Sequence, residues 1–132
     1  MASRLLRDAD EFLINAFCVG RWLYEADHKN HRLIITATHR SVAEQQALYA
    51  QGRTKPGAIV TQVDGVTQKS NHNYLPSRAI DFAIVNRETG AITWADAEYK
   101  VAGPYFVSQG LVWGGNWVSF KDYPHVELKE AP

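Results

Sequence analysis

The chain contains a single cysteine among its 132 residues, so an internal disulfide is excluded. This residue, Cys18, lies among apolar residues in a helical pattern, where a free cysteine is usually a small buried hydrophobe. The chain also lacks an excess of charge of either sign, because 14 basic and 14 acidic residues cancel. This balance gives no reason to expect a polyanion such as nucleic acid as a partner.

A long apolar segment is missing from the N-terminus. The first residues, MASRLLRDADEF, carry charges throughout and contain no apolar core of the kind found in signal peptides. They predict neither a signal peptide nor a membrane span. We therefore expect a cytoplasmic product that does not insert into a membrane.

The elements that are present fit one compact domain over residues 1–132, with 45% hydrophobic residues. A strand is predicted over 32–38 (RLIITAT), and Ser41 with Glu44 forms the capping box of a helix that stops at Gly52. A polar loop is expected over 53–73, a helix near 96–102, a second short helix restarting at Gly103 and Pro104, and a last strand over 125–128. Apolar residues at spacings of three and four predict the buried face of a first helix: Leu5, Ala9, Phe12, Ala16, Val19 and Leu23.

The segment 79–85 (AIDFAIV) has the alternation of a strand with one buried face. Ile80, Phe82 and Ile84 fall on one side. Asp81 falls on the other side, between two alanines, so the carboxylate has room beside it for a ligand.

Asp81 also belongs to a possible metal-binding triple with His72 and His125. Catalytic zinc sites use three protein ligands and keep a fourth position for water, and two histidines with one carboxylate suffice. Spacing alone does not distinguish this triple from others, because the chain has 5 histidines and 14 acids. On spacing alone, hydrogen-bonded structural histidines remain the alternative.

The segments around these residues resemble the motifs of the LAS group of zinc peptidases, which includes VanY-like and VanX-like D-Ala-D-Ala peptidases and phage L-alanyl-D-glutamate endolysins. Together they cover the chain from about residue 32 to 128. The resemblance implies an α+β fold, a small antiparallel sheet flanked by helices, of the Hedgehog and DD-peptidase kind. The matching segments are 38–53 (THRSVAEQQALYAQGR), 70–82 (SNHNYLPSRAIDF), 113–117 (WGGNW) and 120–128 (FKDYPHVEL).

The same resemblance implies that His72, Asp81 and His125 bind one Zn²⁺. It implies further that Asp122 is the general base for a zinc-bound water that attacks the peptide carbonyl, and that Arg40 stabilises the oxyanion. A permanently charged guanidinium suits that task, and a carboxylate can take the proton of a water acidified by zinc. An ordinary solvated acid and a surface arginine are the alternative readings of Asp122 and Arg40.

Four further residues are candidates for supporting or substrate roles. Glu127 shares a strand face with His125 and is expected to orient a histidine ligand, although it is also a rival base. Ser70 either hydrogen-bonds in the site or serves as a turn residue. Trp113 and Tyr123 either line a substrate groove or pack in the core.

One departure from the family pattern is the connection from His72 to Asp81, which is two residues longer than the common form and lacks its glycine. A loop can absorb two residues, so the ligand assignment stands while the shape beside the metal is left open.

The expected function is cleavage of the peptidoglycan stem peptide at the L-alanyl-D-glutamate bond by a phage-type endolysin. We expect a monomer that acts on the cell wall after release and that crosses the membrane with the help of a holin. Alternatives are D-Ala-D-Ala carboxypeptidase or dipeptidase activity, and a non-catalytic, zinc-stabilised virion or binding module.

Overall fold

The computed structural model describes residues 2–130 as an α+β fold around one antiparallel sheet. The sheet has five strands in the order β1-β2-β5-β4, with β3 paired to β2. The α-helices are α1 (Glu11–Asp27), α2 (Val42–Ala50) and α3 (Asp96–Val107). The strands are β1 (His31–Ala37), β2 (Ala79–Asn86), β3 (Ile92–Thr93), β4 (Val112–Trp113) and β5 (His125–Glu127). Short 3₁₀ helices are η1 (Leu6–Asp8), η2 (Asn71–Asn73) and η3 (Gly114–Asn116).

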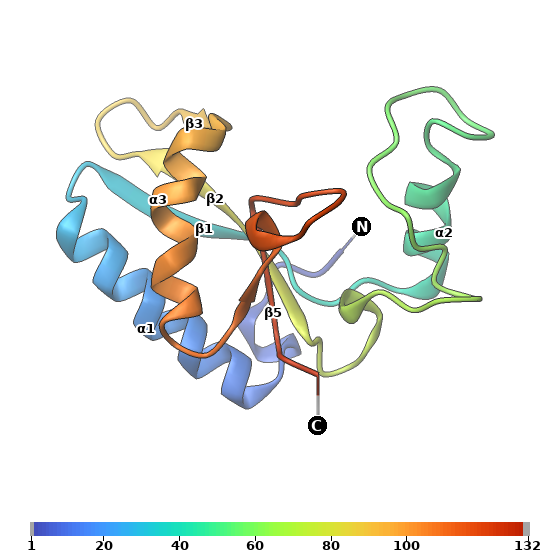
Figure 1. The fold of residues 1–132 in the computed structure, drawn as a ribbon, viewed down its shortest axis with the longest axis horizontal. Coiled ribbons are helices and arrows are strands. Elements are labelled where there is room, and N and C mark those ends of the chain that lie inside the picture. The colour runs from blue at the N-terminus through green and yellow to red at the C-terminus, as the bar shows by residue number, and fades with distance from the viewer. Residues whose placement is uncertain (1, 131–132) are drawn as a thin grey trace.

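The core lies between the sheet and the pair α1 and α3, which run together on one side of the molecule (Figure 1). Ile80, Phe82 and Ile84 of β2 are fully buried there, as the alternation of this strand predicted. Phe17 of α1 and Phe106 of α3 stack at 5.0 Å between ring centroids. α2 and the long loop after it lie on the other side of the molecule, away from this helix pair (Figure 1).

The first helix begins later than predicted and buries a different face. Asp10 caps it, since its side chain accepts from the N–H of Leu13. Its buried residues are Leu13, Ala16, Phe17, Gly20 and Tyr24. Phe12 and Val19, expected in the core, are 60% and 44% exposed. Ala9 and Ala16 are buried as predicted, but the rest of the inward stripe lies one position later in the sequence than predicted.

The third helix also differs from the prediction of two short helices. α3 is continuous through Pro104, and Tyr99, Ala102, Gly103 and Phe106 are buried along it. Proline removes one helical hydrogen bond, but the packing of residues on both sides of it maintains the helix.

α2 begins as predicted, with the reciprocal capping box of Ser41 and Glu44. Over the described residues, no helix is long and apolar enough to cross a bilayer.

Candidate metal centre and cleft

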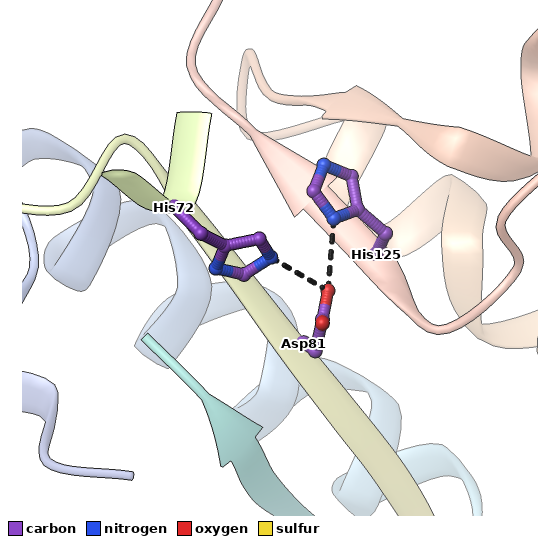
Figure 2. A group of neighbouring side chains, drawn as sticks. All are labelled: His72, Asp81 and His125. Atoms are coloured by element: carbon purple, nitrogen blue, oxygen red, sulfur yellow. Dashed lines mark hydrogen bonds and ion pairs between the residues drawn. The ribbon is translucent and has the colours of Figure 1, made fainter. Parts of the chain in front are cut away.

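The three predicted ligands converge on one point beside the inner strands β2 and β5 of the sheet. His72 lies in η2, Asp81 in β2 and His125 in β5, and Asp81 and His125 are directly paired across the two strands. Their side chains point toward one another, with Asp81 between the two imidazoles (Figure 2). Asp81 Oδ1 is 3.1 Å from His72 Nε2 and 2.8 Å from His125 Nδ1. One ligand atom from each residue lies within 4.8 Å of the others, so the three can hold one ion.

His72 is held in the tautomer that a metal ligand needs. Its Nδ1 lies 2.6 Å from the carbonyl oxygen of Thr38, so Nδ1 carries the proton and donates it. Nε2 therefore presents a lone pair, and it is buried without a hydrogen-bond partner within residues 2–130. This lone pair faces a carboxylate oxygen of Asp81, and two electron-pair donors so close together fit a shared cation.

His125 is bracketed by two carboxylates. Its Nδ1 faces Asp81, and its Nε2 lies 2.7 Å from Glu127 Oε1, the contact expected if Glu127 orients this histidine. Burial lowers the pKa of His125, but hydrogen bonds to Asp81 and Glu127 outweigh it and raise the pKa to about 10. Burial likewise raises the pKa of Asp81, but the two histidines outweigh it and hold the pKa well below its usual range. The pair thus favours a charged carboxylate at the centre of the site.

Arg40 and Asp122 flank the triad. Arg40 Nη2 is 3.7 Å from Asp81 Oδ2, and Asp122 Oδ2 is 3.8 Å from His125 Nδ1. Partial burial, followed by the negative charge of Asp81, raises the pKa of Asp122. The backbone of Asp122 packs on Gly114, whose carbonyl accepts the Asp122 N–H and where an added Cβ would collide with the Asp122 carbonyl.

Gln45 is the residue of this site that the sequence did not single out. Its side chain is fully buried, and its Oε1 accepts from Arg40 Nη1 at 2.9 Å. Its Nε2 donates to the carbonyl of Val63 at 2.8 Å and lies 3.2 Å from Thr61 Oγ1. Gln45 therefore ties Arg40 to the long loop. A signal was present, since Gln45 lies one helical turn after the capping serine, on the face of α2 nearest Arg40.

A cleft of about 680 Å³ opens above the triad. Its floor contains the three ligands, and its rim is formed by residues 60–63 and 68–71 on one side and by Trp117, Ser119 and Phe120 on the other. Ser70 is at this rim, and its hydroxyl caps η2 by accepting from the N–H of His72. Ser70 thus combines a turn role with a position beside the ligand.

Trp113 and Tyr123 are not among the residues that line the cleft. Trp113 is 5% exposed and packs closely on Gly103 and Gly115, and its indole N–H donates to the carbonyl of Tyr123 at 2.7 Å. Of the two alternatives for these aromatics, the structure shows core packing. Trp117 faces the site instead, with its ring 5.2 Å from that of His125.

The longer connection between His72 and Asp81 is fixed by the N-terminal segment. Ser77 is fully buried, its N–H donates to the carbonyl of Asp8, and its carbonyl accepts from Asp10. Its hydroxyl lies 2.9 Å from the same Thr38 carbonyl that holds His72. Because these hydrogen bonds hold the connection in place, its two extra residues do not displace the ligands. The Leu75–Pro76 peptide bond within it is cis.

Known proteins resemble this chain in sequence and in fold. Residues 64–128 match a family described as D-alanyl-D-alanine carboxypeptidase. The peptidoglycan L-alanyl-D-glutamate endopeptidase CwlK of Bacillus subtilis (strain 168) is 42% identical over 113 residues, which are 78% of this chain and 64% of that protein. The chain thus spans somewhat less than two thirds of the length of this curated relative.

The fold is similar to that of the L-Ala D-Glu endopeptidase ChiX of Serratia marcescens, known from a crystal structure. The TM-score is 0.71 at 20% sequence identity, and the match covers 98% of this chain and 89% of that one. This likeness supports the antiparallel α+β architecture described above.

Proposed function

We propose that the chain is a LAS-type zinc peptidase that cleaves the stem peptide of bacterial peptidoglycan at the L-alanyl-D-glutamate bond. The observation that carries the proposal is the triad of His72, Asp81 and His125 at the floor of an open cleft, with Arg40 and Asp122 beside it. The activity named for CwlK, which is 42% identical, indicates the bond.

We assign one Zn²⁺ to His72 Nε2, the carboxylate of Asp81 and His125 Nδ1. Bound there, zinc would acidify a water molecule and polarise the scissile carbonyl. The protein contributes the orientation of the ligands: the Thr38 carbonyl holds Nδ1–H of His72, and Glu127 accepts Nε2–H of His125. Once Nδ1 of His125 has lost its proton, both imidazoles direct a lone pair at the same point.

Asp122 is the proposed general base. Its side chain is 41% exposed and lines the cleft, so substrate and water can reach it. The raised pKa of Asp122 moves its basicity toward neutral pH, where a proton acceptor works best.

Arg40 is the proposed oxyanion donor, because its guanidinium keeps its charge and is aimed at the triad by Gln45.

The test is digestion of purified peptidoglycan by the zinc-loaded protein, followed by mass spectrometry of the products. New amino-terminal D-Glu residues are expected from the wild type. Asp122→Asn, which keeps size and polarity, should release them at least about 100-fold more slowly while binding zinc equally well. Unchanged turnover by this variant would remove Asp122 from the mechanism, and absence of any cleavage by the wild type would leave the non-catalytic zinc module as the better description.

D-Ala-D-Ala carboxypeptidase activity is the second candidate, because the family matched over residues 64–128 carries that description. The same digestion separates the two, since this activity releases free D-Ala from pentapeptide stems and leaves the L-Ala–D-Glu bond intact.

The biological setting we propose is that of a monomeric phage endolysin which reaches the wall through a holin. Expression in a bacterial host should then cause lysis only when a holin is co-expressed. Lysis without a holin would contradict this setting and leave the bond specificity untouched.

A further inference from the structure

A second groove lies along the outer edge of β1, apart from the residues that line the cleft. It has a volume of about 440 Å³ and is lined by Arg4, Arg21, Arg32 and Arg87, by Glu25, and by residues 33–35 of the strand. Four arginines face one glutamate, so the groove carries a clear excess of positive charge. The net charge of the whole chain is zero, so it does not reveal this local excess of positive charge.

The arginines are distributed along the strand. Arg4 follows Ser3, whose carbonyl accepts from Thr38 just beyond the end of β1, while the N–H of Arg87 donates to Asn30 just before its start. A seven-residue strand extends about 20 Å. Arg21 comes from α1, which lies beside β1 (Figure 1). A single small anion cannot contact cations at both ends, so the arrangement suits a chain with repeated anionic groups.

The edge of β1 is closed to an added strand. The outward N–H of Leu33 donates to Glu25 Oε2 at 2.8 Å, and the carbonyl of His31 accepts from Arg87 Nε at 2.9 Å. Side chains therefore occupy backbone groups that a pairing peptide would need. Charge, and not strand addition, is the recognition chemistry that this edge offers.

Two of the four arginines have side-chain contacts and two do not. Arg87 pairs with Glu25 at 3.6 Å, and Arg21 lies over the ring of Phe17. Within residues 2–130, the exposed side chains of Arg4 and Arg32 have no ion-pair or hydrogen-bond partner. All four cations are arginine, whose planar fork binds phosphate through two parallel hydrogen bonds.

We propose that this arginine groove binds a phosphodiester-linked anionic polymer of the bacterial wall and so retains the enzyme on its substrate. The proposal rests on the proposed function, which places the protein at a wall that can carry such polymers. In this proposal the arginine groove holds the enzyme on the wall, and the cleft hydrolyses the stem peptide. Because the arginines are largely exposed, the binding should weaken strongly as salt rises.

The test compares binding to two preparations of the same walls, one untreated and one extracted with hydrofluoric acid to remove phosphodiester polymers. The zinc-loaded full chain is pelleted with each at low salt and in the cold. We expect at least about tenfold tighter binding to untreated walls. The double variant Arg4→Gln/Arg32→Gln should lose about that factor, since each lost contact is a charged hydrogen bond. Lys29→Gln/Lys55→Gln removes the same charge from exposed positions outside the groove and should bind like the wild type.

Equal binding of the wild type to both preparations would overturn the proposal. An arginine variant that loses binding equally on both would assign the groove to carboxylates of peptidoglycan and overturn the phosphate assignment. Equal melting temperatures of the variants exclude unfolding as the cause. Hydrolysis of extracted peptidoglycan, which needs only the cleft, should be the same in the wild type and both double variants. If no preparation is cleaved while the binding differences persist, the proposed peptidase activity fails and the binding site stands.

Discussion

A proton on His125 should compete with the metal ion over the whole neutral pH range. Its Nδ1 is 2.8 Å from Asp81 and its Nε2 is 2.7 Å from Glu127. Burial opposes the charged imidazole, but the two carboxylates prevail and raise the pKa to about 10. Zinc can bind Nδ1 only after this proton has left.

The loss of zinc affinity depends on the difference between the working pH and the pKa of His125. Each pH unit below the pKa costs about 1.4 kcal/mol, so at pH 7 the proton costs about 4 kcal/mol of zinc affinity. Between pH 7.5 and 8.5 the apparent Kd for zinc should fall about tenfold. A histidine with the ordinary pKa of about 6.5 would add almost no change over that interval.

The assay is titration of the metal-stripped protein with zinc against a chromophoric chelator at several pH values. Glu127→Gln removes one of the two carboxylates and should flatten the slope, whereas His28→Gln, which alters a histidine at the far end of α1, should not. An affinity that is constant above pH 7.5 in the wild type would refute the reasoning.

The raised pKa of His125 also determines whether the stability of the metal-stripped chain rises or falls with pH. Because the folded pKa lies above the unfolded value, protonated His125 stabilises the metal-stripped chain fully below about pH 6.5. That contribution is lost as the pH rises toward 10, so the melting temperature should fall over this range unless zinc is bound.

Three substitutions test the supports of the site. Arg40→Ala should lower kcat by about 100- to 1,000-fold with little change in zinc affinity, as expected for loss of an oxyanion donor; steady-state kinetics on a synthetic stem peptide measures it. Gln45→Leu keeps the volume but leaves the Val63 carbonyl with only the long 3.5 Å contact from Thr61 Oγ1, and leaves Arg40 without its acceptor. It should cost about 1–3 kcal/mol of stability in urea unfolding and should lower kcat more than it changes KM, with partial rescue by Gln45→Glu. Gly103→Ala would drive a methyl group into the Trp113 ring and should cost about 1–3 kcal/mol by thermal melting, while Ala97→Gly, at an exposed position of the same helix, tests the effect of backbone freedom alone.

Local patterns in the sequence located the strand that carries Asp81 and the start of α2 better than they located the structure that supports the site. Asp81 could be placed because strand alternation is a local property, and β2 buries Ile80 and Phe82 as that pattern requires. The capping box at Ser41 is likewise local. The position of Gln45 one turn after Ser41 was a local signal, but its contacts with Thr61 and Val63 were not, because these residues lie in a loop without periodicity.

The remaining differences arise where tertiary packing overrides a local signal. Gly103 and Pro104 indicated a break, but the close contact of Gly103 with the Trp113 ring favours an unbroken α3. The same contact explains why Trp113 is in the core and unavailable to substrate. The four arginines of the second groove come from distant segments, and only the fold brings them to one edge.

The floor and the rim of the cleft are built from different kinds of structure, so the sequence of one can change without the other. The metal ligands are tied to strand pairing and to backbone carbonyls, whereas the rim at 60–63 and 117–120 contains no strand within the described residues. Insertions or exchanges in these loops would reshape the walls that receive the peptide without moving the ligands on the floor. For the proposed peptidase, exchanging rim loops between relatives would therefore test whether the walls of the cleft determine which bond is cleaved.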